Sequence, residues 1–173
     1  MIRCAITNGR GIGAAALARA DWVQVREKEM PARALTELAR GLTGRGAKVI
    51  VNTRADVALA AGAAGVHLPA GSVAPAKLRE MTGTALLIGV SCHSIGEAEQ
   101  AEREGADYVF LSPVFPSPSK PGYGPPLGTA LLAEACRRVR IPVLALGGVN
   151  EDNAGVCVAA GAAGFASISA FAD

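Results

Sequence analysis

Short apolar runs alternate with stretches rich in Ala, Leu, Glu and Arg along the whole chain. The apolar runs predict eight strands, at 2–7, 22–26, 48–52, 65–68, 86–90, 107–111, 142–146 and 164–168. The intervening stretches predict helices at 13–19, 31–44, 55–61, 75–81, 95–104, 128–138 and 151–160. Regular strand–helix alternation is the pattern of parallel βαβ units.

An internal repeat supports this count of strands. AGAAGVHL at 61–68 recurs as AGAAGFAS at 160–167, and EGADYVFL at 104–111 is a third version. Each copy places a glycine after a helix and a strand directly behind it. Glycine adopts the left-handed conformation that ends helices at little cost, so each copy predicts one αβ junction.

The positions of polar residues favour a closed (β/α)8 (TIM) barrel over an open doubly wound sheet. They follow nearly every strand, whereas an open sheet binds its ligand at one crevice. We predict a single barrel domain over 1–173, apparently lacking most of the last helix, because the chain stops soon after the eighth strand. An uncovered outer wall would leave an apolar stripe. We therefore expect either a homo-oligomer that covers it or a truncated chain.

Composition excludes several classes of protein. The net charge is +2 with no block of like charge, which argues against nucleic-acid binding and a polybasic membrane anchor. No apolar run approaches the ~18 residues of a membrane span, and the N-terminus turns polar too early for a secretory signal. We expect a cytoplasmic protein. The four cysteines form no CxxC pair, which argues against zinc and for free thiols.

Long polar side chains cluster at the end of the second predicted strand. Strand alternation puts Gln24, Arg26 and Lys28 on one face, where they would bind an anion or else form a solvated end paired with neighbouring glutamates. Asn52 and Thr53 end the third strand. Asn52 would either hydrogen-bond a ligand ring or cap the next helix.

The segment SCHS follows the fifth strand and offers further candidates. Ser91 and His93 are candidate polar ligands, and Cys92 would be a nucleophile only with a base to activate it. His67 lies within a strand and is most simply a structural histidine.

Two later loops complete the set. The Pro/Gly/Ser-rich loop at 112–128 carries Lys120, which would place a cation over a phosphate unless the segment is only a linker. LGGVN follows the seventh strand and SISA ends the eighth, the two places where barrels often bind phosphate through backbone N–H groups. Gly147 and Gly148 would expose those groups, and Ser169 would add a hydroxyl.

Six blocks together resemble the thiamine phosphate synthase/TenI family over most of residues 1–171. They are QVREK, VNTRADVALAAGAAGVHL, IGVSCHS, GADYVFLSPVFPSPSKPG, PVLALGG and GFASISA. The family's synthase joins a hydroxymethylpyrimidine diphosphate to a thiazole phosphate with the aid of Mg²⁺. TenI is a thiazole tautomerase.

The resemblance implies roles for residues by position. Those implied to hold the pyrimidine diphosphate are Arg26, Lys28, Asn52 and Lys120, with Ser91, Ser117 and Ser119 beside it. Those implied to hold the thiazole phosphate are Gly147, Gly148, Ile168 and Ser169.

Two departures from the family pattern bear on mechanism. Thr53 and Ser72 stand where the synthases carry their Mg²⁺-binding Asp pair. We therefore predict no metal-ligating residue, and the sequence supports a Mg²⁺ cofactor only weakly. Pro113 stands where TenI has a catalytic histidine. We predict a thiamine-pathway transferase that binds a small phosphorylated substrate. The alternatives are a TenI-like tautomerase, a non-catalytic binder of phosphate ligands, and another phosphate-sugar barrel.

Overall fold

Eight parallel strands close into a barrel in the computed structural model, which describes residues 1–9, 11–116 and 125–172. Each strand pairs with the next along the chain, and β1 pairs with β8. The strands are β1 (Ile2–Ile6), β2 (Trp22–Val25), β3 (Lys48–Asn52), β4 (Gly65–Leu68), β5 (Leu87–Cys92), β6 (Tyr108–Leu111), β7 (Val143–Ala145) and β8 (Gly164–Ser167). The closed barrel is confirmed and the open sheet is not observed.

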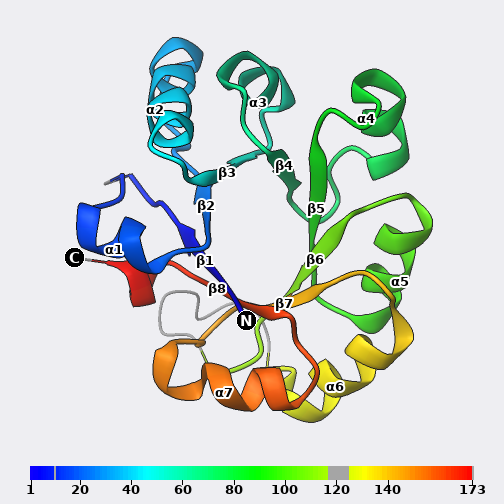
Figure 1. Ribbon diagram of the computed structural model, residues 1–173. Helices are drawn as coiled ribbons and strands as arrows, with labels where there is room; N and C mark the ends of the chain where they lie inside the picture. The colour runs from blue at the N-terminus through cyan, green and yellow to red at the C-terminus, as the bar shows by residue number, and fades with distance from the viewer. Residues whose placement is uncertain (10, 117–124, 173) are drawn as a thin grey trace.

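Within the described ranges, seven helices surround the barrel, one after each of the first seven strands (Figure 1). They are α1 (Ala14–Arg19), α2 (Ala32–Gly44), α3 (Ala55–Ala61), α4 (Pro75–Thr82), α5 (Ile95–Arg103), α6 (Gly128–Arg138) and α7 (Glu151–Ala159). All predicted helices and strands are confirmed to within two residues at each end. A single 3₁₀ turn, η1 (Ser169–Phe171), follows β8.

The core has an inner and an outer layer, since parallel strands in a barrel are covered on both faces. The inner cluster consists of Cys4, Ile6, Tyr108, Phe110, Leu144 and Ala166. Two outer clusters fill the space between strands and helices, one under α2 to α4 and one under α5 to α7. Tyr108 and Phe110, two of the seven aromatic residues, fill the middle of the barrel.

Arg19 of α1 connects the N-terminal part of the chain to α7 and to the segment after β8. Its guanidinium donates to the Glu151 carboxylate at 3.1 Å and to the Ala170 carbonyl oxygen at 3.2 Å. It also lies 5.5 Å from the centroid of the Phe171 ring. The C-terminal segment therefore packs beside α1 (Figure 1), and Phe171 is buried against Phe165 of β8.

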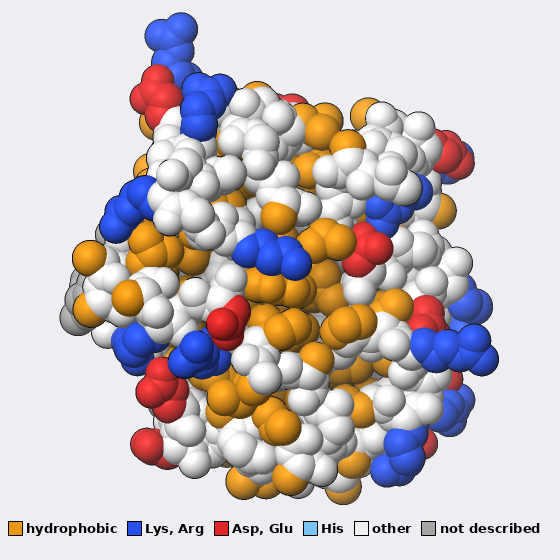
Figure 2. Space-filling view, in the orientation of Figure 1, with side chains coloured by type: hydrophobic (Ala, Val, Ile, Leu, Met, Phe, Trp, Pro, Cys, Tyr) orange, Lys and Arg blue, Asp and Glu red, His pale blue; other side chains and the backbone are white. Residues whose placement is uncertain are grey.

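The outer surface carries charges of both signs. Lys and Arg side chains are interspersed with Asp and Glu on the face shown in Figure 2. Among the described residues, no helix combines the length and apolar character needed to cross a membrane. The longest of the described helices is α2, with 13 residues.

Candidate active site

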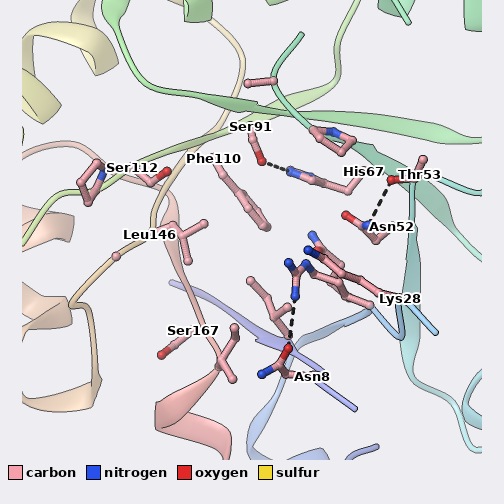
Figure 3. A pocket seen from close by; sticks show the side chains of 18 of the residues that line it. Asn8, Lys28, Asn52, Thr53, His67, Ser91, Phe110, Ser112, Leu146 and Ser167 are labelled. Atoms are coloured by element: carbon pink, nitrogen blue, oxygen red, sulfur yellow. Dashed lines mark hydrogen bonds between the residues drawn. The ribbon is translucent and has the colours of Figure 1, made fainter. Parts of the chain in front are cut away.

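A cavity of about 890 Å³ opens at the carboxyl ends of the strands. Every strand or the loop just after it contributes a lining residue, as the barrel architecture leads one to expect. Figure 3 shows Ser91 beside His67 and Asn52 beside Thr53, with Ser167 on the other side of the view. The predicted positions on β2, β3, β5, β7 and β8 therefore line one space.

The β2 side of the cavity carries two cations, Arg26 and Lys28. The Arg26 guanidinium donates to Asn8 Oδ1 at 3.2 Å, and the Arg26 amide donates to Thr7 Oγ1 at 2.9 Å. Gln24 is only 2% exposed, and its Nε2 has no hydrogen-bond partner among the described residues. A buried donor without a partner costs about 1–3 kcal/mol. Gln24 lines the cavity, so a bound acceptor would remove this cost.

Glu27 and Arg54 add two further charges with different surroundings. Glu27 is 8% exposed and is the only carboxylate among the described residues that line the cavity. Arg54 makes a two-point contact with the Asp56 carboxylate, at 2.8 and 2.6 Å. Hydrogen bonding to Arg54 lowers the pKa of Asp56 to about 2. The charge of Arg54 is therefore already balanced, whereas Arg26 has no ion pair within the part of the chain that the structure describes.

Asn52 faces the cavity and does not cap α3. Its Nδ2 donates to Thr53 Oγ1 at 3.0 Å, while Arg54 occupies the N-cap position without a side-chain bond. Thr53 has a φ of 66°, which is rare for a β-branched residue and costs about 1–3 kcal/mol. Its amide donates to the His67 carbonyl oxygen at 2.8 Å, which holds the turn against β4.

The residues of SCHS have three different environments. Ser91 lines the cavity, and its Oγ lies 2.8 Å from His67 Nε2. His93 Nδ1 lies 2.8 Å from the Ser112 carbonyl oxygen, so this nitrogen carries the proton. Cys92 is fully buried and does not line the cavity. Burial raises the pKa of the Cys92 thiol to about 12, which keeps it protonated and argues against the nucleophile that the sequence allowed.

Sequence reasoning missed the part that His67 and Tyr108 play beside the site. His67 Nδ1 lies 3.1 Å from the Tyr108 hydroxyl, and both side chains are almost fully buried. His67 is satisfied, as expected for a structural histidine, but it also lines the cavity. The sequence did hold one indication of this contact. Gly89 and Ser91 alternate onto one face of β5, and a glycine there leaves room for a large side chain from a neighbouring strand.

Two glycines after β7 line the cavity. Gly147 and Gly148 have φ values of 88° and 64°. A Cβ on Gly147 would lie 2.7 Å from Pro113 Cα, and one on Gly148 would lie 2.5 Å from the Pro116 carbonyl oxygen. Only glycine fits this pair of positions. No acceptor among the described residues takes a hydrogen bond from either N–H group, so both are available to an anion.

The first amides of the neighbouring helix α7 already have a side-chain cap. Asn150 caps α7 by accepting hydrogen bonds from the amides of Asp152 and Asn153, at 3.0 and 3.1 Å. Ile168 and Ser169 follow β8 and line the cavity beside the glycines. The loops after β7 and β8 thus lie at the same end of the barrel as Arg26 and Lys28.

A family model described as thiamine monophosphate synthase matches residues 4–171. The chain belongs to the thiamine monophosphate synthase family. It is 52% identical over 152 residues to a putative thiamine-phosphate synthase of Geobacter sulfurreducens, covering 86% of this chain and 71% of that protein. It is 44% identical to a thiamine-phosphate synthase of Methanoculleus marisnigri, covering 95% and 82%.

Comparison with a solved structure agrees with this family assignment. Thiamine phosphate pyrophosphorylase from Pyrococcus furiosus superimposes with a TM-score of 0.84 at 34% identity, covering 97% of this chain and 85% of that one. Membership of the thiamine monophosphate synthase family makes the chain a thiamine biosynthesis enzyme. The relatives carry the name of the synthase, so the TenI alternative is not needed.

The residues of this family member do not fit the Mg²⁺ that the resemblance implies. Thr53 offers a neutral hydroxyl, and Ser72 is exposed in the β4–α4 loop and does not line the cavity. Among the described residues, no group of three or more His, Cys, Asp or Glu could hold a metal ion. Mg²⁺ prefers hard, usually anionic, oxygen ligands. These two positions therefore offer Mg²⁺ no carboxylate ligand.

Some predicted features of this family member stay predictions. Ser117, Ser119 and Lys120 lie outside the described residues. The cytoplasmic location and the homo-oligomer are also untested.

Proposed function

We propose that the chain joins a hydroxymethylpyrimidine diphosphate to a thiazole phosphate, forming thiamine phosphate and releasing diphosphate. The observation that carries the proposal is one cavity with two separate anion-binding features. The cationic end of β2 supplies one of them, and the glycine amides after β7, which have no acceptor among the described residues, supply the other. A reaction between two phosphorylated substrates requires two such features in one cavity.

The β2 end is suited to the diphosphate. Arg26 offers a planar fork of donors, and Lys28 adds an exposed cation near it at the mouth. Gln24 Nε2 is a buried donor that would meet an uncharged acceptor, such as a ring nitrogen of the pyrimidine. Lys120 would add a further cation, as the resemblance implies.

The glycine end is suited to the thiazole phosphate. Backbone N–H groups bind a phosphoryl oxygen without a counter-charge, and the missing side chains let the oxygen approach. Ile168 and Ser169 border the same place, and we assign the Ser169 hydroxyl to the same phosphate.

The chemistry requires little from the protein beyond position and charge. The bond between the pyrimidine methylene carbon and the diphosphate oxygen breaks, and the thiazole nitrogen forms a new bond to that carbon. Arg26 and Lys28 stabilise the negative charge that develops on the leaving oxygen. Apolar lining residues, among them Ile6, Phe110 and Leu146, would exclude water that could capture the carbon instead.

The test is a direct assay with both substrates. Purified protein is incubated with hydroxymethylpyrimidine diphosphate and thiazole phosphate, with and without added Mg²⁺, and thiamine phosphate is measured by chromatography. We expect product that depends on Arg26. R33A, in an exposed position of α2, is the matched control. Absence of product at high enzyme concentration, with saturable binding of both substrates, would refute the synthase and favour a non-catalytic binder.

A further inference from the structure

Three neighbouring strands bring Tyr108, His67 and Ser91 into one hydrogen-bonded row. Gly89 of β5 lies in register with His67 on one side and with Tyr108 on the other. A Cβ on Gly89 would overlap the Tyr108 ring. Because Gly89 has no side chain, the Tyr108 ring crosses β5 and its hydroxyl reaches His67 Nδ1 at 3.1 Å. On the other side of the imidazole, Nε2 lies 2.8 Å from Ser91 Oγ.

The direction of this row follows from the Tyr108 hydroxyl. Burial raises the pKa of Tyr108 well above its usual value, so the phenol keeps its hydrogen. Tyr108 is 1% exposed, and among the described residues its hydroxyl has no partner but His67. If His67 Nδ1 carried a hydrogen, the phenol hydrogen would be buried without an acceptor. Such a loss reduces the population of that arrangement by about ten- to a hundredfold.

The histidine must therefore be neutral with its hydrogen on Nε2. Burial lowers the pKa of His67 to about 3, which keeps it uncharged at neutral pH. Tyr108 donates to Nδ1, and Nε2–H donates to Ser91 Oγ. The Ser91 oxygen is then an acceptor toward His67, and its own hydrogen is free to point into the cavity that Ser91 lines.

We propose that Tyr108 and His67 are positioning residues that fix the Ser91 hydroxyl as a hydrogen-bond donor to an acceptor atom of the bound substrate. Ser91 would touch the substrate, while Tyr108 and His67 act only through it. This inference rests on the proposed function for the identity of the substrate. The acceptor is either an oxygen of the diphosphate or a ring nitrogen of the pyrimidine, since both accept and neither donates.

The hydrogen positions can be measured in the free protein. Nitrogen-15 NMR of histidine-labelled protein separates the two ring nitrogens by chemical shift, and the His67 signals are assigned with H67Q. We expect protonated Nε2 and unprotonated Nδ1 in the natural chain, and a mixture of the two tautomers in Y108F. Protonated Nδ1 in the natural chain would overturn the inference without any assay of activity.

Binding measurements test the consequence at Ser91. Inorganic diphosphate and hydroxymethylpyrimidine are titrated separately by calorimetry, so the probe that loses affinity identifies the acceptor. We expect S91A to weaken one of the two by about tenfold or more. S94A is the matched control, since Ser94 caps α5 and does not line the cavity. Unchanged affinity of S91A for both probes would overturn the proposal.

A pair of histidine variants separates orientation from packing. Glutamine places an amide nitrogen near Nε2 and can still donate to Ser91, while asparagine places its amide near Nδ1 and cannot. We expect H67Q to bind the affected probe at least fivefold more tightly than H67N, and equal affinity would contradict the inference. If the probes depend on Ser91 but thiamine phosphate is never formed, the proposed function fails and the orientation stands.

Discussion

Gly148 and Gly155 allow one substitution to be tested in two opposite environments. Gly148 has a φ of 64°, and an added Cβ would lie 2.5 Å from the Pro116 carbonyl oxygen and 2.8 Å from Phe115 Cβ. Gly155 lies in α7, and an added Cβ would have nothing within 4 Å. The same methyl group should therefore destabilise the protein at one site and stabilise it at the other.

The magnitudes follow from the local geometry. Alanine in the left-handed region costs about 1–2 kcal/mol, and the crowded contacts with the β6 loop add about 1–3 kcal/mol. G148A should therefore lower the free energy of unfolding by about 2–5 kcal/mol. G155A should raise it by about 0.5–1 kcal/mol, since alanine is the better helix former. For a domain of this size, these changes correspond to a Tm lower by roughly 4–20 °C and higher by roughly 1–4 °C.

The assay combines unfolding with ligand binding. Thermal and urea unfolding are followed by circular dichroism, and thiazole phosphate is titrated at a temperature where both variants are folded. We expect G148A to lose at least tenfold in affinity, because the methyl group displaces the loop that frames the amides, while G155A keeps the natural affinity. Shifts of the same sign for the two variants would refute the packing argument. Natural affinity in G148A would refute the phosphate site.

Three further predictions concern charge, stability and pH. R26A should raise the KM for the pyrimidine diphosphate about 10- to 100-fold in steady-state kinetics. A change no larger than that of R33A would contradict this. R79A should lower the free energy of unfolding in urea by about 1–3 kcal/mol without changing kcat/KM, because the Arg79 guanidinium donates to the Leu86 carbonyl oxygen at 2.8 Å and to Asp107 at 2.6 Å. R79K should recover only part of this loss, and a full recovery would show that charge alone suffices. The pKa of His67 is lowered from 6.5 to about 3, so the unfolded chain binds more protons between these values and stability falls as pH falls below 6.5, by about 2 kcal/mol at pH 5. The difference in urea stability between the natural chain and H67Q should show this slope, and parallel pH curves would refute it.

The sequence predicted the barrel well because the ends of each strand and helix are marked by residues close to them in the chain. The strand at 65–68 is bounded by a helix-ending glycine and a polar turn, and the structure has β4 at those same residues. Gly62 ends α3 in the left-handed conformation, as its place in the repeat predicted. The polar ends of β2 and β3 and the Gly147–Gly148 pair also line one cavity, as predicted from their places after strands.

The remaining features of the site depend on contacts between strands, which no local pattern records. The row from Tyr108 to Ser91 exists because register places Gly89 between two larger side chains. The unpartnered Nε2 of Gln24 depends equally on what surrounds β2 in three dimensions. Asn52 was ambiguous between capping and binding for the same reason, since only the structure shows which way the amide points.

The pairing of β1 with β8 has a consequence for how the enzyme becomes active during synthesis. Arg26 leaves the ribosome before Gly147 and Ser169, yet all three must border the same cavity. A nascent chain that has made only the first strands has a sheet with two open edges and no enclosed cavity. Catalytic competence should therefore arise in one late step, when the last strand inserts beside the first.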